Sequence, residues 1–339
     1  MEKKERYNYR VRIGYVMAVF VTFIHNCSFS LWPQSSFNDF VCDFLMNVLP
    51  KCAVPIFYMM SAVLLFRGEY NLEVYKKKMR RRIGSLVVPY LLWNTIGLLF
   101  TLFRTELLSR IMTINYSFDV SFTSIIRAII LHTEMPPMWF MEHLIIYSLA
   151  SPIIYCLAKN KWTAVGTLMT WLVLISLVKM PHRMPMSFFM YFLGAVIGIH
   201  FFDWFMEKNE EKKNLILSVA IITCFFVYGL LHLDKTKIPE CMDIVFIAVY
   251  SLASWNILKL LFCGEPKSFE RNSIMLYFMH PIVLPIISNC LVRILPSGAW
   301  FSIFAFVICN VVLYIVVEIC CRVLKKISPV FFGVLSGGR

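Results

Sequence analysis

The sequence predicts an all-α protein that crosses a membrane many times, and three observations carry this prediction. Hydrophobic residues make up 59% of the 339-residue chain and charged residues only 16%, whereas soluble domains carry about a quarter charged residues. Apolar runs long enough to cross a bilayer recur along the chain. The basic residues cluster between these runs, which excludes both a soluble fold and a nucleic-acid surface built on the net charge of +13.

A spanning helix needs about 20 mostly apolar residues. Segments that reach or approach this length predict about ten transmembrane helices in a single integral membrane domain over residues 1–339, with no appended soluble domain. Pro50 and Lys51 interrupt the second segment and predict an irregular stretch there. The segments are 12–32, 40–66, 86–103, 138–158, 163–179, 186–205, 215–232, 242–262, 273–292 and 299–321.

The distribution of Lys and Arg predicts the orientation. Most of the 33 basic residues fall on one side of the membrane if the N-terminus lies inside, as the positive-inside rule favours. We therefore expect an N-in, C-in topology. A basic cytoplasmic loop then covers residues 67–85, and an outer loop covers 104–137 with an amphipathic stretch around FTSIIRAIILH.

Two histidines lie deep inside apolar segments. His25 falls within the uncharged run 13–38, about 18 Å along a helix from its start at 1.5 Å per residue. His280 is followed by Pro281 and Pro285, which predict a kinked helix with backbone carbonyls freed toward a cavity. An ionisable residue at membrane depth suggests function, but imidazoles also hold helices together, so the residues alone leave both interpretations open.

The charged residues near these segments are less specific. Glu142 has no local basic partner, and it either orients an imidazole or faces the outer water. Glu318 precedes Arg322 by four residues, so a helical ion pair explains it. The run KKKMRRR at 76–82 suits anionic lipid on the inner face and equally suits a polyphosphate ligand. The 11 cysteines lack metal-ligand spacing and predict no metal site.

Six stretches of the chain carry a family resemblance when they are taken together. In order along the chain, they resemble the conserved stretches of the acyltransferase family 3 integral membrane proteins over nearly the whole length. The stretches are RIGYVMAVFVTFIHN, VPIFYMMSAVLLFR, YKKKMRRRIGSLVVPYLLW, MWFMEHLIIY, FFMYFLGAVIG and SIMLYFMHPIVL.

The resemblance implies an enzyme that transfers an acyl group, most often acetyl from acetyl-CoA, to a hydroxyl of a cell-envelope glycan or polysaccharide. It also implies a multi-pass protein of the bacterial inner membrane. His25 would act as general base or carry the acyl group, with His280 and Glu142 as further catalytic groups. The other residues that the resemblance assigns are Arg12, Lys78, Arg81 and Arg82 for the CoA phosphates, and Ser61, Trp139 and Tyr277 for the substrate.

Two positions depart from the family pattern. Gly14 stands eleven residues before His25, where the family usually has an arginine on the same helix face as the histidine. Ser85 stands where the family tends to have a second basic residue, one turn before the proline of VVPYLLW. Arg12 is the nearest basic residue to His25 on this helix, and it faces another direction unless its side chain curves round.

A transporter or flippase for a lipid-linked sugar or polysaccharide is the rival hypothesis, because broken helices and buried histidines also suit a proton-coupled carrier. The lack of an evident internal repeat and the scarcity of charged residues inside the segments argue against it. The sequence leaves open the acceptor, the acyl chain length and whether the chain forms a homo-oligomer.

Overall fold

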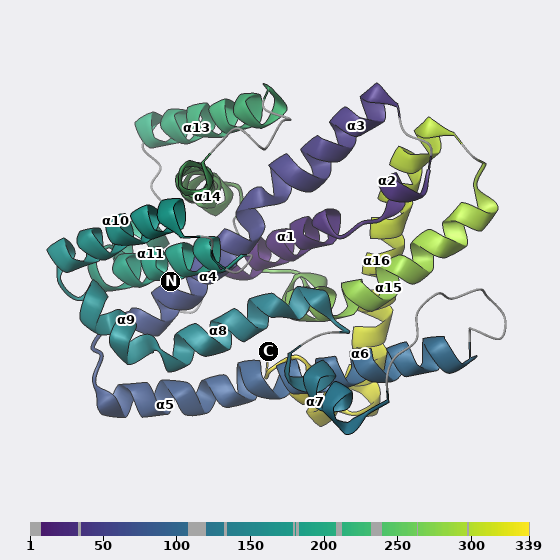
Figure 1. Cartoon of the computed structure of the whole chain (residues 1–339), viewed down its shortest axis with the longest axis horizontal. Helices are drawn as coiled ribbons and strands as arrows, with labels where there is room; N and C mark the ends of the chain where they lie inside the picture. The colour runs from purple at the N-terminus through teal and green to yellow at the C-terminus, as the bar shows by residue number, and fades with distance from the viewer. Residues whose placement is uncertain are drawn as a thin grey trace.

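The computed structural model describes residues 8–32, 35–107, 120–131, 134–178, 180, 183–207, 212–231, 239–262, 264–296 and 298–338. Helices account for nearly all of these residues, and no strand occurs among them (Figure 1). The α-helices are α1 (Tyr9–Ile24), α2 (Ser28–Leu31), α3 (Ser36–Cys42), α4 (Ala53–Phe66), α5 (Leu72–Arg82), α6 (Val88–Leu107), α7 (Phe122–Ile130), α8 (Trp139–Leu149), α9 (Ser151–Ala158), α10 (Lys161–Leu177), α11 (Met184–His200), α12 (Phe202–Met206), α13 (Lys212–Leu231), α14 (Glu240–Leu261), α15 (Ser273–Ile294), α16 (Ala299–Ile327) and α17 (Pro329–Leu335).

The helices confirm an all-α polytopic membrane protein. Within the described part of the chain, seven helical stretches are long and apolar enough to cross a membrane, and the bent pair α8–α9 can form an eighth. The apolar helices α10 and α11 are shorter. Each predicted segment coincides with one of these stretches, while the number that cross the bilayer and the N-in, C-in orientation stay predictions.

The first predicted segment is divided into two helices, and His25 lies at the end of the first of them rather than within a helix. Helix α1 ends at Ile24, with His25 as its C-cap, and the short helix α2 begins at Ser28. The Asn26 side chain accepts hydrogen bonds from the Ser28 backbone N–H at 3.0 Å and from the Ser28 hydroxyl at 2.6 Å. Such local bonds compete with the helical ladder, so the helix stops where the histidine begins.

The segment predicted over 138–158 is also broken. Helices α8 and α9 meet at a bend of 68°. Pro152 lies in the first turn of α9, where it has no N–H to continue the hydrogen-bond ladder of α8. The two helices therefore form either a broken span or a re-entrant loop.

Two irregular regions of the sequence are helical in the structure. The interruption at Pro50 and Lys51 is a π-helical turn, Asp43–Val48, followed by a 3-10 turn, Leu49–Cys52, which leads into α4. The basic stretch predicted as a loop contains α5, because Asn71 caps its start and Lys and Arg are good helix formers. A π-helical turn joins α5 to α6 along one edge of the molecule (Figure 1).

Close packing of α4 against α11 forms the centre of the fold. A Cβ atom on Gly194 would lie 2.6 Å from the Cα of Met59, and one on Gly198 would lie 2.9 Å from the Cα of Val63. Small residues four positions apart allow such a close approach between membrane helices. Helices α1 and α8 contact α4, and α15 contacts α1, so α4 holds the surrounding helices in register.

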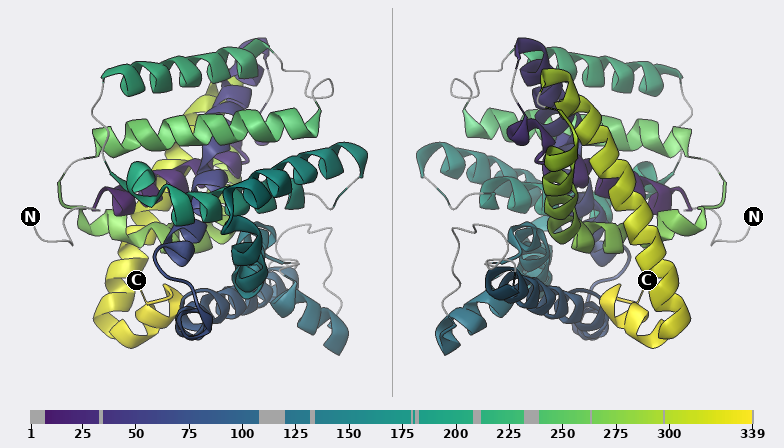
Figure 2. Two further views of the ribbon diagram at one scale, coloured as in Figure 1. Left: turned by 90° about the vertical axis from the view of Figure 1, so that its left-hand side faces the viewer. Right: turned by 90° about the vertical axis from the view of Figure 1, so that its right-hand side faces the viewer.

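Helices α13 and α14 lie side by side (Figure 2), and α14 also packs against α4 and α11. An ion pair between Lys51 and Asp243, with Nζ and Oδ1 2.9 Å apart, connects the start of α14 to the turn before α4. Neither α13 nor α14 contributes a residue that the sequence predicted for the site.

Candidate active site

The two histidines singled out by the sequence meet in the structure. His25 at the end of α1 and His280 in α15 have ring centroids 5.0 Å apart. The ring of His280 is fully buried, while that of His25 is partly accessible. Two helices from opposite ends of the chain therefore place their imidazoles together.

Hydrogen bonds to backbone carbonyls define which nitrogen of His25 carries a proton. Its Nδ1 lies 2.9 Å from the carbonyl oxygen of Val21. A carbonyl can only accept a hydrogen bond, so Nδ1 carries the proton and Nε2 presents its lone pair. A neutral imidazole in this tautomer is a base at Nε2.

His280 has the same tautomer because of the proline that follows it. Pro281 has no N–H to donate to the carbonyl of Tyr277, one turn earlier. Nδ1 of His280 bonds to that carbonyl at 2.6 Å, and Nε2 of His280 is buried without a hydrogen-bond partner. Pro281 therefore frees a backbone carbonyl, as predicted, and this carbonyl orients the imidazole of His280. Helix α15 nevertheless continues as one helix through Pro281 and Pro285.

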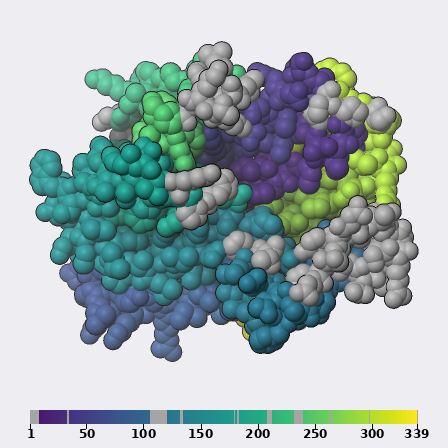
Figure 3. Space-filling model, viewed as in Figure 1, coloured from purple at the N-terminus to yellow at the C-terminus, as the bar shows by residue number. Residues whose placement is uncertain are grey.

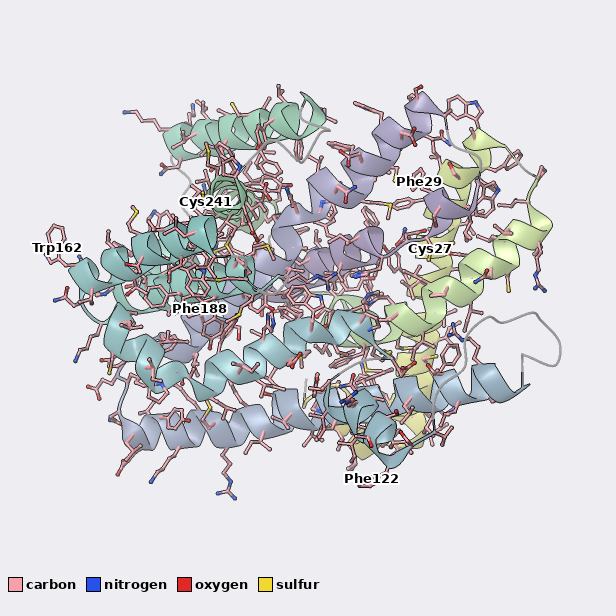
Figure 4. The ribbon with its side chains drawn as sticks, in the orientation of Figure 1. Cys27, Phe29, Phe122, Trp162, Phe188 and Cys241 are labelled. Atoms are coloured by element: carbon pink, nitrogen blue, oxygen red, sulfur yellow. The ribbon has the colours of Figure 1, made fainter. Side chains whose placement is uncertain are left out.

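An open pocket of about 460 Å³ leads to His25. The end of α1, α2, α3 and the π-helical turn after α3 form it, and its polar lining includes Asn26, Ser30 and Asp39. Two other lining residues, Cys27 and Phe29, are labelled between α3 and α15 in Figure 4. In Figure 3 the purple atoms of this N-terminal segment are visible between the teal helices and the yellow-green C-terminal helices. The imidazole of His25 is thus reachable from outside the helix bundle.

Aromatic side chains from α4, α8 and α15 pack beside the histidines. Tyr277 lies 5.9 Å from His280 between ring centroids, and its hydroxyl donates to the carbonyl of Pro137 at 2.6 Å. Tyr58 lies 6.3 Å from Trp139 between ring centroids. The structure therefore brings the predicted substrate residues Tyr277 and Trp139 to the same region as the two histidines.

A second polar cluster surrounds Arg82. Its Nη1 donates to the hydroxyls of Ser61 and Ser148, each at 2.9 Å, and its Nη2 donates to the carbonyl of Ser61 at 2.9 Å. Lys78, one turn earlier, donates to the carbonyl of Leu65. Arg81, the residue before it on α5, is exposed. The structure therefore joins Arg82 to Ser61 and separates Arg81 from both.

Tyrosine side chains connect the two clusters. Tyr58 is one turn before Ser61 on α4, and its ring centroid lies 6.2 Å from that of Tyr147. Tyr147 precedes Ser148 on α8, and its ring lies 5.2 Å from that of Tyr191. An aromatic layer thus runs from the histidines to the Arg82 cluster.

Arg12 lies outside this arrangement. Its Nε is 2.9 Å from Oε1 of Glu270, and its guanidinium lies 5.2 Å from the ring centroid of Phe262. At Gly14 a Cβ atom would meet only the Ser273 hydroxyl oxygen, 4.0 Å away. Arg12 therefore does not take the place of the family arginine, and the position of Gly14 faces α15.

Glu142 lies within electrostatic range of Tyr90 on α6. On the same helix it is the neighbouring His143 that points toward the aromatic layer, where its Nδ1 is 2.9 Å from the Ser187 hydroxyl and its ring is 5.4 Å from that of Trp139. His143, Ser187 and Ser148 were not predicted from the sequence as residues of the site. No local pattern marks them, because their partners lie on other helices.

No group of three or more His, Cys, Asp or Glu side chains in the described ranges is arranged to hold a metal ion. What the site offers is two imidazole bases, an arginine cluster and an apolar aromatic layer between them. This combination suits proton transfer and the binding of a partly apolar substrate.

The fold and these two clusters define a polytopic membrane protein with a polar site inside its helix bundle. The acyltransferase family 3 model, described as an acyltransferase domain, matches residues 15–317, and the chain therefore belongs to this family. It is a membrane acyltransferase. No curated protein and no solved structure matches the chain.

Proposed function

We propose that this membrane acyltransferase moves an acetyl group from acetyl-CoA to a hydroxyl of a cell-envelope glycan or polysaccharide, in the inner membrane of a bacterial cell. The observation that carries the proposal is the imidazole of His25 at the pocket, with Nδ1 bonded to a backbone carbonyl and Nε2 left as a base, and with the buried ring of His280 directly behind it, 5.0 Å away between centroids. A positioned general base contributes about 10²–10⁴-fold to such a reaction.

In this proposal the acceptor binds in the pocket beside His25. Nε2 of His25 takes the proton of the acceptor hydroxyl as its oxygen forms a bond to the thioester carbonyl carbon. The C–S bond then breaks, and the imidazolium returns the proton to the leaving thiolate, so the products are an ester and free CoA thiol. His280 is close enough to share the proton while it is held, since the two rings are in contact.

The donor would approach from the side of the Arg82 cluster. Arg82 uses three of its N–H donors on Ser61 and Ser148, and a guanidinium has five. The remaining donors, with Lys78 and the exposed Arg81, would bind the CoA phosphates. The acetyl group would then lie along the aromatic layer that contains Tyr58 and Tyr277.

The direct test uses the purified protein in liposomes that enclose labelled acetyl-CoA, with cell-envelope polysaccharide outside. We expect labelled ester on the polysaccharide and an equal amount of free CoA thiol inside. Liposomes without protein are the control. Movement of polysaccharide or sugar across the membrane without consumption of acetyl-CoA would favour the transporter hypothesis instead.

A further inference from the structure

Arg183 is a cation at the site that neither the sequence motifs nor the proposed chemistry uses. It precedes α11 with a backbone φ of 72°. Among the described residues it is the only non-glycine residue with a positive φ. Such a backbone conformation persists only where the surroundings hold it, so the backbone at Arg183 is held in place.

The side chain of Arg183 extends over the aromatic layer beside the histidines. The centre of its guanidinium lies 4.8 Å from the ring centroid of Trp139. It is within electrostatic range of His25, Tyr58 and Tyr277, which come from three different helices. Arg183 therefore lies near the proposed base and the aromatic layer.

No carboxylate of the described residues forms an ion pair with Arg183. Other arginines of the chain are neutralised in this way: Arg12 by Glu270 at 2.9 Å and Arg322 by Glu318 at 2.8 Å. Contact with an aromatic ring occupies one face of a guanidinium and leaves the in-plane N–H donors available. Those donors match the geometry of a carboxylate or a phosphate.

We propose that Arg183, held against Trp139, forms an anion-binding subsite for the acceptor, and that the acceptor carries a carboxylate or phosphate close to the hydroxyl that is acylated. This inference rests on the proposed function, because it assumes that the acceptor binds beside His25. It adds the chemical class of the acceptor. The anion supplies the charge that none of the described residues places beside Arg183 in an ion pair.

A binding experiment without acetyl-CoA tests this inference independently of catalysis. The full-length protein in nanodiscs is titrated with trigalacturonate, with its neutral methyl ester and with glucose 6-phosphate. We expect at least about tenfold tighter binding of trigalacturonate or glucose 6-phosphate than of the methyl ester, as for a charge-assisted bidentate contact. The two anionic probes distinguish a carboxylate from a phosphate.

Variants of Arg183 then test whether this residue causes the tighter binding of the anionic probes. Arg183→Gln should abolish it, and Arg183→Lys should keep part of it, because a lysine retains the charge without the planar fork. Lys161→Gln is the matched control, since Lys161 lies 5.5 Å over the ring of Phe201 at another place. A size-exclusion profile equal to that of the unmodified protein shows that each variant is folded. If Arg183→Gln does not fold, the binding test is made with Arg183→Lys.

Two results would overturn the inference. One is a wild-type protein that binds the anionic probes no more tightly than the methyl ester, or that binds none of the three. The other is an Arg183→Gln protein that keeps the preference. Failure of acetyl transfer in the liposome test would instead remove the proposed function while leaving the binding result intact.

Discussion

The histidine cluster and the Arg82 cluster differ in how far the protein satisfies their hydrogen bonds. At the histidines, each Nδ1 is fixed by a backbone carbonyl, and Nε2 of His280 has no partner although it is buried. At Arg82, three donors already bond to Ser61 and Ser148. An unsatisfied buried polar atom costs free energy, and Nε2 of His280 carries this cost directly beside the proposed base.

The difference separates two roles. Backbone carbonyls position the two imidazoles through Nδ1 and leave Nε2 for the reaction, as a general base requires. The Arg82 cluster ties α4, α5 and α8 together, so its first role is to hold these helices and only its remaining donors can bind a ligand. The following predictions test this contrast, from the largest expected effect to the smallest.

Replacement of His25, the proposed base, should have the largest effect on the rate of acetyl transfer. His25→Gln should lower the kcat of acetyl transfer by about 10²–10⁴-fold, the contribution of a positioned general base, with little change in the amount of folded protein. The measurement is transfer of label from acetyl-CoA. His200→Gln is the control, because His200 also bonds a backbone carbonyl, that of Ala158 at 2.9 Å, far from the pocket.

Replacement of Arg82 should lower the stability of the protein. Arg82→Gln leaves Ser148 and the Ser61 carbonyl without their charged donor, and we expect a loss of about 2–4 kcal/mol of unfolding free energy from charge-assisted bonds of this kind. Thermal unfolding in detergent measures it. Arg81→Gln, on the exposed side of the same helix, should leave the melting temperature unchanged. Equal melting of the two variants would contradict the structural role of Arg82.

The proline that orients His280 should have a smaller effect. Pro281→Ala adds an N–H that competes for the Tyr277 carbonyl, and release of the His280 ring should lower kcat by about tenfold, the size expected for a misplaced catalytic group. Pro285→Ala is the matched control in α15, since the carbonyl that bonds the His280 imidazole belongs to Tyr277, four residues before Pro281 and not before Pro285. Histidine ¹⁵N chemical shifts would report the tautomer, and an unchanged spectrum in Pro281→Ala would argue against this orientation mechanism.

Much of the fold and of the local chemistry could be predicted from the sequence. Apolar length located the apolar helices, although it did not locate α5, and spacing within one helix predicted the pair Glu318–Arg322, whose Oε1 and Nε lie 2.8 Å apart. The break at His25 was missed because it depends on side-chain bonds of Asn26 to Ser28. Apolar length cannot reveal such a local competitor of the helix.

Contacts between distant segments could not be predicted from periodicity. The sequence marked His25 and His280 separately, but only packing of α1 on α15 joins them. Ser148 and Arg183 gave no signal, because a serine or a terminal arginine in an apolar segment is ordinary. Their significance comes from partners on other helices, Arg82 and Trp139.

The central claim is that the two imidazoles act together on one proton, and a double-mutant cycle on acetyl transfer tests it most directly. The kcat/KM values of His25→Gln, His280→Gln and the double variant are compared with that of the unmodified protein. The account predicts that the double variant is scarcely slower than His25→Gln alone, as for residues that work as a unit. Effects that multiply independently, or full activity in His25→Gln, would contradict it.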